Sequence, residues 1–131
     1  MDENDNSREY LRLLARVLGV YRVIELAASL LPIPITLPDV DGDPQPPLED
    51  VMFSVRRAWV LLPEQIGASE IAQAALQSAL THWLVAVDML ALHANDDEGE
   101  EWRLTGALLN LRYAMAGARL AVEELSELAD E

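Results

Sequence analysis

The sequence predicts an all-α protein, a four-helix antiparallel bundle with a long proline-rich connector after the first helix. Four segments carry apolar residues at helical spacing, and no segment shows the alternation of a strand. Six of the seven prolines lie within residues 32–47. A chain of 131 residues is expected to form a single domain.

The first helix is predicted over residues 8–31, after an acidic tail at residues 1–7 that ends in the candidate N-cap Ser7. Its apolar residues step by four and three positions, which places them on one face. They are Tyr10, Leu14, Val17, Tyr21, Ile24, Ala28 and Leu31. Pro32 should stop the helix, because proline lacks an amide hydrogen and clashes with the preceding turn.

Residues 32–47 are predicted to form an extended connector that crosses the domain, with a functional loop as the alternative. Asp39, Asp41 and Asp43 have the spacing that opens a calcium-binding EF-hand loop, but Pro44 stands where that loop requires glycine. We therefore expect a solvated turn here, with weak calcium binding as the alternative.

A short helix is predicted over residues 48–62, where Pro47 and the acids Glu49 and Asp50 suit a helix start. Its apolar face consists of Val51, Met52, Val55, Trp59 and Leu62. The next helix is predicted over residues 69–94, with Ser69 as its candidate N-cap. Its apolar seam consists of Leu76, Leu80, Trp83, Val87 and Leu90. The polar residues inside this apolar helix favour a buried core helix over a membrane span.

The last helix is predicted over residues 97–129, with a heptad seam typical of helix–helix packing. The seam consists of Leu104, Leu108, Leu111, Met115, Ala118, Val122, Leu125 and Ala129. At 1.5 Å per residue this helix would span about 50 Å, whereas a compact domain of this size has a radius of gyration of about 14 Å. Such a helix would overhang its own domain, so we expect a homodimer.

A second stripe of small residues on the last helix is assigned to the dimer seam, with tight packing inside the monomer as the alternative. It consists of Gly106, Asn110, Ala114, Gly117 and Ala121. The bundle order also predicts that the acidic end of this helix lies beside the basic start of the first helix. The expected partners are Glu123, Glu124, Glu127, Asp130 and Glu131 on one side and Arg8, Arg12 and Arg16 on the other.

The net charge of −14, with nine arginines and no lysine, disfavours binding to nucleic acids or to anionic membranes. An acidic surface instead suits a basic protein or peptide. The chain has no cysteine, which excludes disulfides and thiolate metal sites. No signal peptide or membrane span is evident, so we expect a cytoplasmic protein.

The chemistry-bearing residues concentrate on the third and fourth helices. Asp88 is a candidate general base or ligand anchor, and His82 is the second catalytic candidate. The alternative for Asp88 is a core aspartate paired with an arginine. The candidate binding residues are Thr81, Trp83, Arg112 and Arg119. His82 and His93 would lie about 16 Å apart on one helix, so they cannot share a metal, and we expect neither metal nor cofactor.

The favoured function is a small acidic binding or accessory protein that holds a protein or peptide partner through apolar helical surface. The first alternative is a cofactor-free enzyme or small-molecule binder that positions a peptide or natural product for cyclisation or isomerisation. The second is a structural subunit of a larger assembly. No catalytic motif is present, so the enzyme question stays open and leans towards a non-catalytic protein.

Overall fold

A computed structural model of the chain describes residues 3–94 and 101–129, and it is all-helical over both ranges. The elements are α1 (Glu3–Ser29), α2 (Leu48–Leu61), the short 3-10 turn η1 (Leu62–Glu64), α3 (Glu70–Ala94) and α4 (Glu101–Ala129). α1 therefore begins before the predicted start, and Ser7 lies inside it. Residues 97–100, assigned to the last helix from the sequence, lie outside the described residues.

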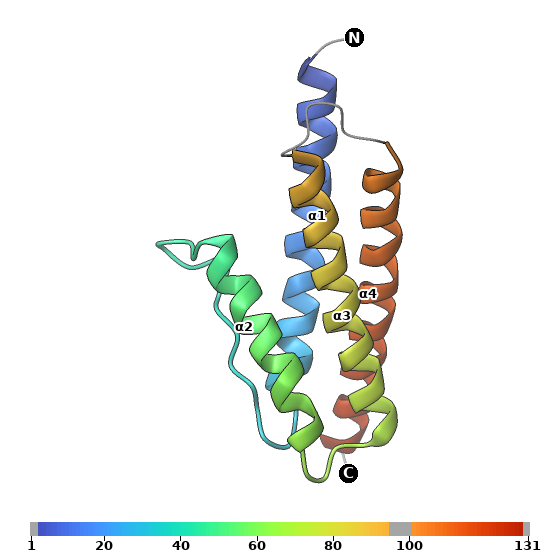
Figure 1. The fold of residues 1–131 in the computed structure, drawn as a ribbon. Helices are drawn as coiled ribbons and strands as arrows, with labels where there is room; N and C mark the ends of the chain where they lie inside the picture. Colours follow the sequence, from blue (N-terminus) through green and yellow to red (C-terminus); the bar gives the residue numbers. More distant parts are fainter. Residues whose placement is uncertain (1–2, 95–100, 130–131) are drawn as a thin grey trace.

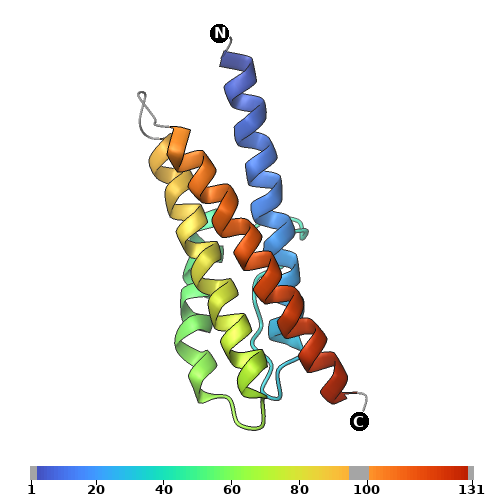
Figure 2. The ribbon, with the colours of Figure 1, turned by 90° about the vertical axis from the view of Figure 1, so that its right-hand side faces the viewer.

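The direction of the helices differs from a simple up-and-down bundle. In Figures 1 and 2, α1, α2 and α4 run in one direction and α3 runs against them. α1 and α4 are therefore parallel neighbours, because the connector brings the chain back along the bundle before α2 begins (Figure 1).

The predicted pairing between the two charged helix ends is consequently wrong. The start of α1 and the end of α4 lie at opposite ends of the molecule (Figures 1 and 2). Arg8, Arg12 and Arg16 are thus remote from the acidic end of α4. A connector of this length allows either direction for the next helix, so the sequence pattern could not decide between them.

The length of α4 does not by itself require a second copy. α4 has 29 residues, and its neighbours α1 and α3 have 27 and 25. The three helices lie along one another, so the whole molecule is elongated (Figure 2). The expectation of a dimer from the length of the last helix assumed a compact domain, and the protein is elongated instead.

The predicted seams of α1, α3 and α4 meet in one core. On α3 the whole seam from Leu76 to Leu90 is buried, and on α4 the same holds for Leu111, Ala118 and Leu125. The α1 seam is buried as well from Val17 onwards, whereas Tyr10 and Leu14 are half-buried. The first turns of α1 extend past the described ends of α3 and α4, so no other described helix packs against them (Figures 1 and 2).

The stripe of small residues on α4 packs against α3 inside the monomer, so its assignment to a dimer seam is wrong. A Cβ atom added to Gly117 would lie 2.7 Å from the backbone oxygen of Ala75, and one added to Gly106 would lie 2.9 Å from Met89 Sδ. Ala114 and Ala121 are fully buried. Small side chains allow two helix backbones to approach closely, and here the partner backbone is α3.

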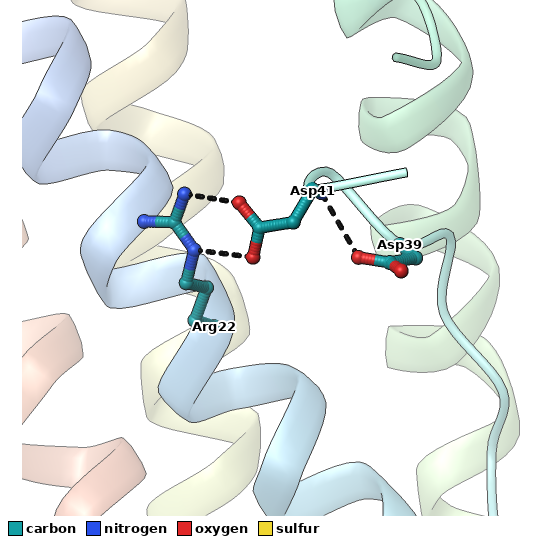
Figure 3. A network of polar contacts seen from close by, with 3 residues as sticks. All are labelled: Arg22, Asp39 and Asp41. Carbon is teal, nitrogen blue, oxygen red and sulfur yellow. Dashed lines mark hydrogen bonds and ion pairs between the residues drawn. The ribbon is translucent and has the colours of Figure 1, made fainter. Parts of the chain in front are cut away.

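The connector is fastened to α1 by polar contacts (Figure 3). Arg22 forms a two-pronged ion pair with Asp41, with Nε–Oδ2 and Nη2–Oδ1 distances of 2.9 and 2.6 Å. The backbone amide of Asp41 donates to Asp39 Oδ1 at 2.9 Å. Nearby, the buried Tyr21 hydroxyl donates to the Pro38 carbonyl. Two of the three carboxylates that suggested calcium binding, Asp39 and Asp41, thus already have partners.

α2 and α3 are joined by the 3-10 turn η1 and by one side-chain hydrogen bond, between Trp59 and Thr81. Ser69 caps α3, because its Oγ accepts the backbone amide hydrogen of Ala72 at 3.0 Å. The Trp59 indole donates to Thr81 Oγ1 at 3.0 Å, and Trp59 is more exposed than the face prediction implied. One helical segment, Glu70–His93, is long and apolar enough to cross a membrane, and 44% of its most apolar window is buried inside the protein.

Candidate functional site

An open apolar groove lies between α1 and α4. It has a volume of about 430 Å³. α1 contributes Ala15, Arg16, Gly19 and Val20, and α4 contributes Leu108, Leu111, Arg112 and Met115. Two helices alone form its walls. The groove is therefore a surface feature suited to an elongated occupant more than an enclosed pocket.

Helical periodicity brings these residues to the groove. The α1 residues fall at positions i, i+1, i+4 and i+5, and the α4 residues at i, i+3, i+4 and i+7, so each set occupies one face. The two helices also splay apart towards their N-terminal ends (Figure 2). Leu108 and Met115 consequently stay half-buried on the groove floor, although they belong to the predicted heptad seam.

No packing contact inside the monomer requires a glycine at position 19. A Cβ atom added there would meet no heavy atom within 4 Å, in contrast to Gly106 and Gly117, which α3 crowds. Glycine in a helix interior costs about 1 kcal/mol relative to alanine. The neighbouring Ala15 is small and exposed as well. This side of α1 therefore leaves room at the groove for another chain to approach its backbone.

The groove carries positive charge in an otherwise acidic protein. Residues 10–24 of α1 and residues 102–122 of α4 each contain three arginines and no acid. Arg16 and Arg112 flank the apolar floor directly. Arg12 and Arg119, both exposed, continue the same helix faces one and two turns away. In the described residues Arg22 is already paired with Asp41, so it is excluded from this group.

The residues predicted to form a catalytic or ligand site do not converge. Asp88 is exposed on α3, so the expectation of a covered carboxylate is wrong. Arg112 flanks the α1–α4 groove, and within the described chain no ion pair joins Asp88 to Arg112 or Arg119. Asp88 is therefore neither a paired core residue nor part of an enclosed pocket.

The other candidate residues have structural partners. Trp83 is fully buried and donates to the Val17 carbonyl at 3.0 Å, so it belongs to the core and does not line a pocket. Thr81 is exposed and holds the Trp59 indole. His82 Nδ1 lies 2.9 Å from Asn110 Oδ1, and its ring contacts that of Tyr113. Nδ1 of His93 is buried, and none of the described residues forms a hydrogen bond with it.

Two further observations bear on other chemistries. In the described part of the chain, no group of three or more His, Cys, Asp or Glu side chains is placed to hold a metal ion. A second hollow of about 370 Å³ lies between the connector and α2. At the edge of this hollow the Gln65 side chain forms hydrogen bonds with the backbone amide and the backbone carbonyl of Ile33. The hollow is therefore the boundary between two segments that pack against each other.

No protein-family model, curated protein or solved structure matches the chain. The groove itself was missed by sequence reasoning, which considered the apolar seams of the first and last helices but not the space beside them. Two signals could have indicated it. One is a glycine in mid-helix with no capping role, and the other is the pair of acid-free, arginine-bearing runs on two helices.

Proposed function

We propose that this protein is a helical binding module that holds an amphipathic helix of a partner protein in the α1–α4 groove. The observation that carries the proposal is Gly19, a helix-interior glycine with empty space at its missing side chain, on the floor of an apolar groove. A helix laid into a groove binds through apolar residues at i, i+3, i+4 and i+7 spacing.

The charge around the groove favours an acidic partner helix. Arg16 and Arg112 border the groove, and no acid occurs on the facing stretches of α1 and α4. Acidic side chains that flank the apolar stripe of a bound helix would meet these arginines. The overall acidity of the chain led us to expect a basic partner, but the local charge of the groove favours the opposite sign.

The experiment uses two labelled synthetic peptides that share a leucine stripe at heptad spacing. One has glutamate at the flanking positions and the other has lysine. Fluorescence anisotropy at low and high salt measures their binding to the full chain. We expect the glutamate peptide to bind and the lysine peptide not to bind, and we expect salt to weaken the interaction because exposed charges are screened.

Three variants locate the site. A Cβ atom at position 19 meets no heavy atom within 4 Å, so Gly19→Leu should place its side chain in the groove, abolish binding and raise helix stability. The double variant Arg16→Glu, Arg112→Glu should weaken binding by about tenfold or more, since charge reversal adds repulsion. Arg56→Glu, an exposed arginine on α2, is the matched control and should leave binding unchanged. Equal binding of both peptides, or full binding by Gly19→Leu, would refute the proposal.

A further inference from the structure

α3 and α4 present a second apolar surface on the side away from α1, here named the α3–α4 face. Its members are Val85 and Leu92 on α3 and Trp102, Leu109, Tyr113 and Leu120 on α4. Tyr113 and Leu92 expose 60% and 59% of their surfaces. Exposed apolar side chains that stand singly are normal, but a continuous apolar face indicates an interaction surface.

The contacts of α4 fix the position of this face. α4 turns Leu108, Leu111 and Met115 towards α1 at the groove, and Gly106 and Gly117 contact α3. At 3.6 residues per turn, Leu109, Tyr113 and Leu120 fall on the remaining side, next to α3. The ring of Tyr113 lies 5.3 Å from that of His82, which confirms that this side adjoins α3.

The α3–α4 face carries fewer charges than a solvated helix surface normally does, and its one acid on α3 is the exposed Asp88, a neighbour of Val85 and Leu92. Residues 71–87 of α3 contain no charged side chain, although 24% of the whole chain is charged. On α4 the exposed apolar positions follow the heptad-like steps of seven, four and seven residues. By comparison, Phe53 and Val60 are exposed on α2, but Arg56 and Arg57 lie between them.

We infer that the α3–α4 face is an interface between two copies of this chain, related by a two-fold axis. The six side chains expose 36–60% of their surfaces, and at an area of roughly 150–250 Å² for a large apolar side chain their exposed parts amount to about 500 Å². A standard interface buries about 800 Å² per partner, of which somewhat more than half is apolar. The apolar area of the face therefore matches what one protomer contributes to a stable dimer.

A second copy is also the occupant that best suits a face with little charge. A two-fold interface brings the same patch of both protomers together, so a patch with several charges of one sign would repel itself. On α3 the face carries no charge over residues 71–87 and the single acid Asp88 beyond them, whereas the α1–α4 groove has arginines on both sides and would repel a second groove. The dimer and the proposed helix-binding groove thus use different surfaces, and neither depends on the other.

Sedimentation equilibrium of the full chain over a range of concentrations tests the inference. The native protein should be a dimer. Leu109→Glu and Tyr113→Glu should each weaken the dimer at least tenfold, because buried aromatic and aliphatic anchors dominate interface energy. Phe53→Glu, which places the same charge at an exposed apolar position on α2, should remain dimeric. Circular dichroism should show the same helix content for all four proteins.

A monomeric native protein would overturn the inference, and so would a Tyr113→Glu variant that dimerises as tightly as the native chain. Flotation of a monomeric native protein with phosphatidylcholine vesicles would assign the face to a lipid surface instead. Failure here is separable from failure of the groove. Gly19→Leu should stay dimeric, and Tyr113→Glu should still bind the glutamate-flanked peptide.

Discussion

Trp83 on α3 donates its indole N–H to the backbone carbonyl of Val17 on α1, 3.0 Å away in the centre of the core. Both residues are fully buried, and the Trp83 ring lies 5.7 Å from that of Tyr21. The contact joins two helices that are distant in the sequence. A buried indole needs such a partner, because an unsatisfied polar group in a core is costly.

Replacing Trp83 by phenylalanine should lower the free energy of unfolding by about 1–3 kcal/mol. The loss combines one buried hydrogen bond with the volume left by the smaller ring. Urea denaturation followed by circular dichroism measures it. Trp59, whose indole bond to Thr81 is exposed, provides a matched Trp→Phe control that should lose less stability. Equal stability of both variants would show that the Trp83–Val17 bond contributes nothing.

Gly19→Ala and Gly117→Ala should shift stability in opposite directions. Both sites are helical, so alanine gains up to about 1 kcal/mol of helix propensity at each. At Gly117 the new Cβ would lie 2.7 Å from the Ala75 backbone oxygen, which forces α3 and α4 apart and costs about 1–3 kcal/mol. At Gly19 it meets open space. Thermal denaturation of the two variants shows whether each substitution raises or lowers stability. Stabilisation by Gly117→Ala would contradict the close approach of α3 and α4.

The ion pair between Arg22 and Asp41 should make stability depend on acid pH. The hydrogen bond from Arg22 lowers the pKa of the Asp41 carboxyl below its usual range. A group with a lowered folded-state pKa contributes stability above its unfolded pKa, near 4 for aspartate, and the contribution disappears as pH falls through the folded-state pKa. Native protein and Asp41→Asn should therefore differ at pH 7 and converge near pH 2. A difference in stability that stays constant from pH 7 to pH 2 would show that the ion pair between Arg22 and Asp41 does not cause it.

His82 should carry its neutral-state proton on Nδ1. Asn110 Nδ2 donates to the Gly106 carbonyl at 2.8 Å, which turns Asn110 Oδ1 towards His82 Nδ1 as an acceptor. The imidazole must then supply the hydrogen. Nitrogen-15 chemical shifts of the ring distinguish the two tautomers, and Asn110→Ala should relax the preference. Dominance of the Nε2–H tautomer in the native protein would contradict this arrangement.

The helices and their buried faces were largely predictable, because periodicity is a local property of the sequence. Val17, Trp83 and Leu111 were assigned to seams and are buried. Pro32 and Ser69 were assigned to helix ends, and α1 ends just before Pro32 while Ser69 caps α3. The candidate site was not predictable in the same way. Asp88 has an apolar sequence context but is exposed, since helix neighbours in sequence point to different sides.

Residue patterns along the chain establish that it is helical, where most helices end and which residues face inward. Which helix meets which face depends on how the helices are arranged in the fold. Gly106 and Gly117 are suited to close approach of any backbone, and the fold supplies α3. The parallel course of α1 and α4 follows from a connector long enough to reverse the direction that a short loop would impose. Periodicity fixes the face that is buried, and the path of the chain fixes its partner.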